Sequence, residues 1–162
     1  KSSSGKLIFK ESIYANLTFL FDLKMINYFF EDTNFKFNKR RATSKWLKSA
    51  IALENKKLGD ISIIYCSDDY LLEINKQYLS HDYYTDVITF NYCEGDLISG
   101  DIFISVDTIK ANAEEYGASF DNELCRVMVH GILHLIGYDD DCESNQLIMR
   151  QKEDFYLERY DK

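Results

Sequence analysis

The sequence predicts a single α+β domain in which a mixed sheet of about four strands is covered by helices. Segments rich in β-branched and aromatic residues alternate with segments of helical periodicity, and helices gather towards the end of the chain. With 162 residues, 46% of them hydrophobic, the chain is long enough to bury one core. We assign residues 25–162 to this domain. Residues 1–24, which open with Lys-Ser-Ser-Ser-Gly, form an N-terminal extension or a remnant of cloning.

Four short runs of β-branched and aromatic residues predict the strands. They cover residues 26–30, 60–65, 87–92 and 100–105. The chain contains no proline, so its turns rely on Gly, Asn, Asp and Ser.

Apolar residues at helical spacing predict five helices. The helices cover residues 43–53, 68–79 after a Ser67 cap, 106–116 ending at Gly117, 121–136, and 143–160. The residues expected on their apolar faces include Leu53, Leu71, Leu72, Ile74, Tyr78, Leu147, Ile148, Phe155 and Leu157.

The stretch 127–141, VMVHGILHLIGYDDD, contains two histidines one helical turn apart. On a helix, His130 and His134 project from the same face, which is the spacing that two imidazoles need to share one metal ion. Gly137 is expected to end the helix in the left-handed conformation, so that the residues after it fold back towards the rings. A carboxylate could then complete a three-ligand site with an open fourth position, as in catalytic zinc centres.

The alternative is a buried helix with two partly buried histidines and no metal. The segment is apolar nearly all round, and two histidines in such a helix cost free energy unless each is hydrogen-bonded or ligated, which favours a metal site. Gly131 follows His130, so the HExxH pattern of zinc peptidases is absent. Cys142, close in sequence, is either a further ligand or a plain thiol in a turn.

Residues 130–139, HGILHLIGYD, resemble the HGxLHLxGYDH motif of the YbeY family. Its members are metal-dependent endoribonucleases of bacterial ribosomal RNA maturation. The resemblance implies a single-strand-specific endoribonuclease of rRNA maturation and ribosome quality control. It also implies one zinc ion as cofactor, and ribosomal RNA or small-subunit precursors as partners. The third histidine of the family falls at Asp140, so the implied metal ligands are His130, His134 and Asp140.

Residues 75–90 resemble a second family segment, with Thr85-Asp86-Val87 as the best match. Family members commonly have a phosphate-binding arginine where this chain has Leu79, which puts that role in doubt here. His81, two positions on, is our candidate for a positive or proton-donating catalytic group. The alternative is a surface loop histidine.

Three more residues are candidates for the site. Asp139 stands beside the third ligand as a general base or supporting carboxylate. Arg126, one turn before His130, pairs either with substrate phosphate or with Glu123 on the same helix face. Asp86 either accepts the second N–H of a metal-bound histidine or caps a turn.

The net charge of −8 opposes a generally basic RNA-binding surface. Six basic residues within positions 36–48 form either a local positive patch or a solvated helix face: Lys36, Lys39, Arg40, Arg41, Lys45 and Lys48. The four cysteines form no CxxC pair, which predicts reduced thiols in a cytoplasmic protein. No apolar run approaches the roughly twenty residues of a membrane span, so no membrane association is expected.

Three functions remain open on the residues alone. The first is the zinc-dependent endoribonuclease. The second is a zinc metallopeptidase-like hydrolase with the same metal site, which Gly131 weakens. The third is a non-catalytic ribosome-assembly binding module with a structural metal, which the acidic charge and Leu79 favour.

Overall fold

Four strands form one mixed sheet in the order β1-β2-β4-β3. The structure is a computed structural model and describes residues 24–160, so nearly all of the predicted extension lies outside the described residues. Strands β1 (Ile26–Glu31), β2 (Lys57–Cys66) and β4 (Leu97–Ser105) run parallel, and β3 (Val87–Asn91) pairs antiparallel with β4. Strands β1 and β3 are therefore the two edges of the sheet.

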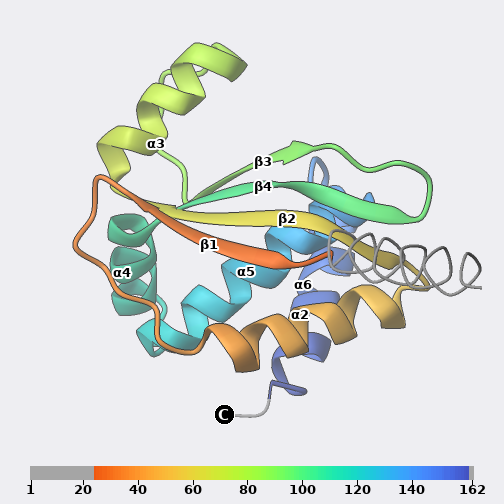
Figure 1. Cartoon of the computed structure of the whole chain (residues 1–162). Coiled ribbons are helices and arrows are strands. Elements are labelled where there is room, and N and C mark those ends of the chain that lie inside the picture. The colour runs from red at the N-terminus through yellow and green to blue at the C-terminus, as the bar shows by residue number, and fades with distance from the viewer. Residues whose placement is uncertain (1–23, 161–162) are drawn as a thin grey trace, which may run out of the picture.

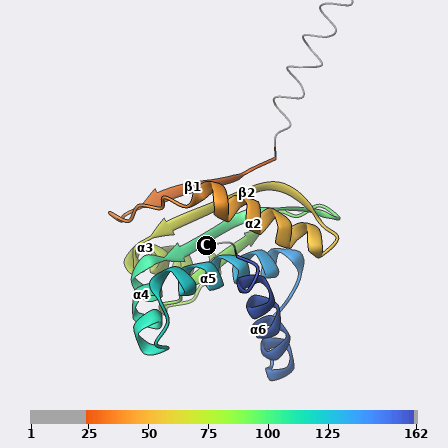
Figure 2. The same cartoon turned by 90° about the horizontal axis from the view of Figure 1, so that it is seen from below.

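Four helices lie on one side of this sheet (Figures 1 and 2). They are α2 (Arg40–Leu53), α4 (Val106–Glu115), α5 (Phe120–Ile136) and α6 (Glu143–Leu157), with α6 packed on α5 and not on the strands. On the other side, α3 (Asp68–Ile74) continues into η1 (Asn75–Leu79), a short π-helix. The predicted α+β domain with a mixed four-stranded sheet is confirmed.

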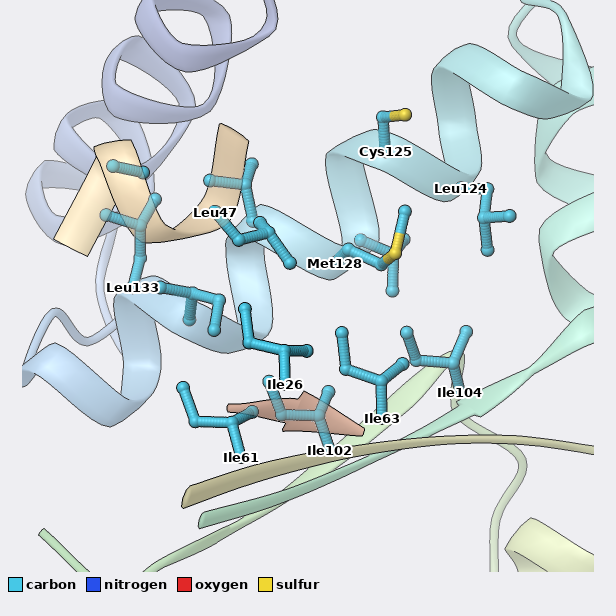
Figure 3. Packing of buried hydrophobic residues seen from close by; sticks show 14 of the residues in the cluster. Ile26, Leu47, Ile61, Ile63, Ile102, Ile104, Leu124, Cys125, Met128 and Leu133 are labelled. Carbon is cyan, nitrogen blue, oxygen red and sulfur yellow. The ribbon is translucent and has the colours of Figure 1, made fainter. Parts of the chain in front are cut away.

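Helix α5 lies at the centre of the main core, against isoleucines of β2 and β4 (Figure 3). Ile132 and Leu133 are fully buried, and burial of each such side chain stabilises the fold by about 1.5–3 kcal/mol. Gly131 permits the close approach of α5 to the sheet. A Cβ atom at this position would lie 2.7 Å from Cγ2 of Ile102 on β4, too close for any ordinary contact.

Several apolar residues predicted to face the core are exposed instead. They are Leu53 (55% exposed), Tyr78 (59%), Leu147 (60%), Ile148 (45%) and Phe155 (40%). Helix α6 buries Met149, Glu153 and Tyr156, a stripe at three- and four-residue spacing that leaves Leu147, Ile148 and Phe155 outside. Leu157 is partly buried against the main core, as predicted. Tyr78 lies in η1, where the wider π-turn changes which residues share a face.

The element boundaries differ modestly from those predicted. Helix α2 begins at Arg40, β2 begins at Lys57, and α6 ends at Leu157. The predicted Ser67 cap is confirmed, because its hydroxyl accepts a hydrogen bond from the backbone N–H of Tyr70. All four cysteines are free thiols. Within residues 24–160, no helix has both the length and the apolar character needed to cross a bilayer.

Candidate metal centre

Helix α5 ends at Gly137, and this end shapes the site. Gly137 has φ +114°, in the left-handed region, as predicted. The N–H of Gly137 donates to the carbonyl of His134, and the N–H of Tyr138 donates to the carbonyl of Leu133, which is the Schellman arrangement. The chain therefore reverses and carries residues 138–140 back past the last turn of the helix.

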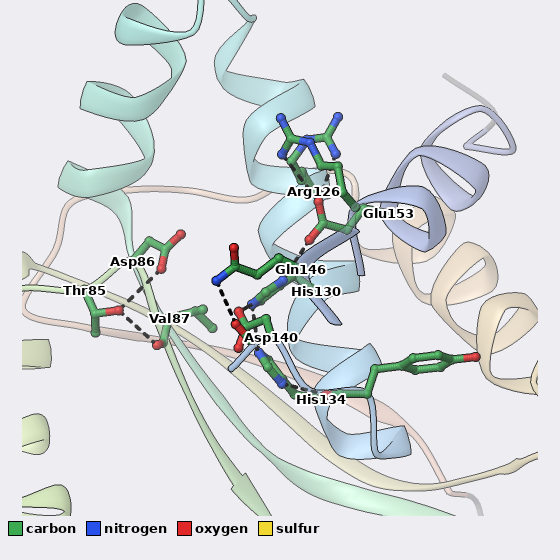
Figure 4. Close-up of polar contacts among 11 residues, drawn as sticks. Thr85, Asp86, Val87, Arg126, His130, His134, Asp140, Gln146 and Glu153 are labelled. Carbon is green, nitrogen blue, oxygen red and sulfur yellow. Dashed lines mark hydrogen bonds and ion pairs between the residues drawn. The ribbon is translucent and has the colours of Figure 1, made fainter. Parts of the chain in front are cut away.

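His130, His134 and Asp140 come together at this reversal (Figure 4). The two Nε2 atoms lie 2.9 Å apart, and Oδ2 of Asp140 lies 3.6 Å from Nε2 of His130 and 3.7 Å from Nε2 of His134. One donor atom from each residue lies within 4.8 Å of the other two. The sequence therefore named three residues that the fold brings into one cluster.

The other ring nitrogen of each histidine already has a partner. Nδ1 of His134 lies 2.9 Å from the carbonyl oxygen of Tyr138, and Nδ1 of His130 lies 2.8 Å from Oε1 of Glu153. A carbonyl or carboxylate oxygen only accepts, so both Nδ1 atoms donate. In the neutral rings the lone pairs of both Nε2 atoms then face each other, beside a carboxylate. Such a donor set fits a cation that takes two nitrogens and one oxygen.

The two histidines have opposite pKa shifts. Burial alone would lower the pKa of His130, but the hydrogen bond and negative charge of Glu153 outweigh burial, and this pKa is raised. Burial and the positive charge of neighbouring His130 lower the pKa of His134.

Glu153 supports the site from the buried face of α6. It is 5% exposed, and burial alone would raise its pKa, but the hydrogen bonds from His130 and Arg126 outweigh burial and lower it. Arg126 lies 2.9 Å from Glu153 and 2.8 Å from Asp154. Among the described residues Arg126 does not form the ion pair with Glu123 that was one of its two alternatives, because α6 offers the guanidinium two carboxylates.

Asp86 does not hold either histidine, contrary to the possibility considered from the sequence. It stands at the start of β3, where it accepts a hydrogen bond from Thr85 at 3.4 Å, while Glu153 and the Tyr138 carbonyl hold the imidazoles. Sequence reasoning missed Glu153 because it lies 23 positions after His130, on another helix. Its place in the stripe with Met149 and Tyr156 was the only available clue.

A residue in the first half of α6 also holds Asp140, whose carboxylate is the third member of the cluster. The side-chain amide of Gln146 donates to the backbone carbonyl of Asp140 at 3.0 Å (Figure 4). Asp141 points elsewhere and accepts a hydrogen bond from Asn145 at 2.7 Å. Cys142 is exposed beside Ser144, so it does not join the cluster.

Glu54, the residue that follows α2, also holds the segment 138–140 that folds back past the end of α5. It accepts hydrogen bonds from the Tyr138 hydroxyl at 2.8 Å, from Lys152 at 2.7 Å, and from the Tyr156 hydroxyl. Tyr138 is thus held at its ring end by Glu54 while its carbonyl receives the N–H of His134. Nothing in the sequence indicated this link, which joins residues 84 positions apart.

The three donors line a cleft of about 350 Å³ between α5 and the loop that leads into β3. The other residues that line it are Asn75, Leu79, His81, Tyr83, Thr85, Asp86, Val87, Ile88 and Thr89. His81 therefore lines the same cleft as His130, His134 and Asp140, as its candidate role requires. Asp139 is exposed and, among the described residues, does not line the cleft.

The basic residues of positions 36–48 lie elsewhere. Arg40 stands over the ring of Phe30 on β1, at 5.2 Å from its centroid, and Lys39 pairs with Asp121 at 2.7 Å. The cleft is lined by β3, at the opposite edge of the sheet. In the described part of the chain this basic segment therefore does not line the cleft.

Comparisons with known proteins agree with this fold and motif. The sequence model of the family described as Endoribonuclease YbeY matches residues 27–161. A relative named Endoribonuclease YbeY from Bacteroides thetaiotaomicron is 55% identical over 115 residues, covering 71% of this chain and 84% of the relative. Another from Flavobacterium psychrophilum is 46% identical over 136 residues, covering 84% and 96%. The solution structure of TM1509 from Thermotoga maritima superimposes with a TM-score of 0.60 at 31% identity, covering 84% of this chain and 89% of that one. The family match spans nearly all of the described fold, and the chain belongs to the YbeY family.

Proposed function

We propose that this protein is a zinc-dependent endoribonuclease that cuts single-stranded RNA in the cytoplasm, during ribosomal RNA maturation and ribosome quality control. The observation that carries the proposal is the pair of inward-facing histidine Nε2 atoms beside the Asp140 carboxylate, in a cleft open to solvent. The relatives named as endoribonucleases support the reaction class. Precursors of the small ribosomal subunit are the proposed partner.

One zinc ion is the proposed cofactor, held by His130, His134 and Asp140. Two imidazole nitrogens and one carboxylate oxygen are acceptable zinc ligands, and three protein ligands leave a position open. When bound, zinc supplies a Lewis acid that lowers the pKa of water and stabilises charge on the scissile phosphate.

The remaining polar groups divide into positioning and chemistry. Glu153 and the Tyr138 carbonyl keep each Nδ1 protonated, so that both Nε2 lone pairs stay available. Arg126 is a positioning residue, because both of its ion pairs join α5, on which it lies, to carboxylates of α6. His81 is our proposed proton donor to the leaving oxygen, since it lines the cleft opposite the ligands. Asp139 is retained as the proposed general base, beside the third ligand.

The test uses the full chain, stripped of metal with a chelator and reloaded with zinc. The substrates are a mixed-sequence single-stranded RNA, the same RNA in a duplex, and a fragment of a small-subunit rRNA precursor. We expect cuts within the single strand, loss of cutting in the stripped protein, and recovery on adding zinc. His81→Ala should lower kcat by about a hundredfold with zinc content unchanged.

His130→Ala, purified in parallel, is the control for contaminating ribonucleases and should be inactive. If the zinc-loaded protein cuts no RNA at any salt concentration, the proposal is wrong. Tight rRNA binding without cleavage would then favour the binding module. Cleavage of an unstructured polypeptide would favour the peptidase-like hydrolase.

A further inference from the structure

The cleft wall formed by the loop between η1 and β3 carries two stacked rings. The rings of His81 and Tyr83 lie 5.1 Å apart, with an interplanar angle of 23°, and Nδ1 of His81 lies 3.1 Å from the Tyr83 hydroxyl. Both residues line the cleft that holds the metal ligands, and Tyr83 is 57% exposed. Each ring contacts its partner on one side, so the pair presents aromatic surface to solvent within the cleft.

Backbone contacts hold this wall in place independently of the two rings. Asn75 is 2% exposed, and its side-chain amide donates to the backbone carbonyl of Tyr83 at 2.9 Å. The backbone carbonyl of Asn75 accepts the N–H of His81 at 3.2 Å. Between them Ser80 adopts φ +58°, which ends the π-helix and turns the chain into the cleft. The loop is therefore fixed through its main chain, and a ring can be removed without releasing it.

The cleft lacks the side chains that usually bind phosphate. Among the described residues that line it there is no lysine or arginine, while Asp86 and Asp140 add negative charge. Leu79, 42% exposed on the same wall, offers apolar surface. Ion pairing with the RNA backbone is therefore weak at this point, whereas every base has a flat face that stacks on an aromatic ring whatever the sequence.

We propose that His81 and Tyr83 form a platform on which one unpaired base of the RNA stacks, next to the bond that is cut. The inference rests on the proposed function and identifies the residues that select single strands. A base in a duplex already has both faces covered by its neighbours, so only an unpaired base can use the platform. Tyr83 is thus a specificity-determining residue for this cleft, and it binds the base without taking part in proton transfer.

The test measures binding with metal chelated, so that nothing is cut. The probes are a short single-stranded RNA of mixed sequence carrying 2-aminopurine, and the same strand with abasic sites in place of its bases. Tyr83→Leu keeps apolar volume but removes the ring, and Tyr83→Trp restores a ring. We expect Tyr83→Leu to weaken binding of the intact strand by about tenfold, Tyr83→Trp to restore it, and quenching of 2-aminopurine to be lost only in Tyr83→Leu.

Tyr92→Leu is the matched control, because Tyr92 is also 57% exposed but lies outside the cleft. It should bind like the wild type. The platform is overturned if Tyr83→Leu binds the intact strand as tightly as the wild type, or if it weakens binding of the abasic strand equally. These outcomes do not depend on cleavage. A protein that cuts RNA without stacking refutes the platform alone, and one that stacks bases without cutting refutes the nuclease alone.

Discussion

Glu153 on α6 receives the Nδ1–H of His130 on α5 at 2.8 Å, while its second oxygen pairs with Arg126 at 2.9 Å. This one buried carboxylate fixes the tautomer and orientation of His130 and ties the two helices together beside the candidate metal site. The position of α6 therefore determines the geometry of a site that belongs mostly to α5.

Glu153→Gln should lower zinc affinity about 10- to 100-fold, because the amide accepts the imidazole N–H more weakly than the carboxylate does. Zinc affinity is measured by competition with a chromophoric chelator. Asp154→Asn is the matched control, since Asp154 pairs with the same Arg126 but is not bonded to His130 in the structure. Equal losses in both variants would mean that helix packing, and not the hydrogen bond to His130, is what matters.

Asp140→Ala should lower zinc affinity far more than Asp141→Ala. Asp140 places its carboxylate within 4 Å of both histidine Nε2 atoms, whereas Asp141 bonds to Asn145. Asp140→His should retain zinc, because imidazole is an equally acceptable ligand. Zinc content after dialysis decides the matter. Similar losses of zinc in Asp140→Ala and Asp141→Ala would mean that Asp140 is not the third ligand.

The parts of this site that depend on local spacing could be predicted from the sequence. One-turn spacing placed His130 and His134 together, and Gly137 predicted the reversal that brings Asp140 to them. The supporting residues could not be predicted, because Glu153 and Glu54 reach the site only through the packing of α6 and α2.

The same limit applied to burial and charge. Helix α6 carries apolar residues on more than one side, and only its docking on α5 selects Met149 and Tyr156 over Leu147 and Ile148. The basic residues of positions 36–48 lie close enough in the sequence to suggest a positive surface patch. Whether that patch reaches the cleft depends on strand order, which puts β1 and β3 at opposite edges.

Stability at low pH should depend on Glu54. Burial alone would raise its pKa, but hydrogen bonds from Lys152, Tyr156 and Tyr138 outweigh burial and lower it from its ordinary value of 4.5. A lowered folded-state pKa contributes stability that is present above 4.5 and is lost as the pH falls through the lowered value. Glu54→Gln should therefore reduce the free energy of unfolding by about 1–3 kcal/mol at neutral pH.

Denaturant unfolding of wild type and Glu54→Gln across this pH range checks the prediction. The difference between the two should shrink as the pH is lowered below 4.5. Glu158→Gln, an exposed change just past α6, controls for the loss of one negative charge. A difference that stays constant with pH would mean that Glu54 acts through packing alone.

Gly131→Ala should destabilise the protein by about 1–3 kcal/mol, since the added methyl must push against Ile102. The contact at 2.7 Å involves the branch of a buried isoleucine on β4, which has little room to move. Ile102→Val keeps Cγ2, so combining it with Gly131→Ala should cost about the sum of the two single losses of stability. Ile102→Ala removes Cγ2, so combining it with Gly131→Ala should cost clearly less than the sum of its two single losses. Additive costs across this cycle, measured by thermal unfolding, would contradict the contact.

The basic segment of positions 36–48 should affect long RNA and not the chemistry at the cleft. Arg41 and Lys45 are exposed on α2, Arg41 beside β1 and Lys45 beside the end of α6. Neither forms an ion pair with a carboxylate of the described residues. Replacing both with glutamine should weaken binding of an rRNA fragment and reduce the slope of log affinity against log salt by about one to two. A strand of a few nucleotides fills only the cleft, so its rate of cleavage should be unchanged.

The matched control is Lys57→Gln with Lys110→Gln, which changes the net charge equally at exposed positions outside the segment. If the control variant loses as much affinity for the rRNA fragment, only the overall charge matters. If the Arg41 and Lys45 double variant cleaves the short strand more slowly, the prediction is wrong and even a short RNA must extend from the cleft to the basic segment.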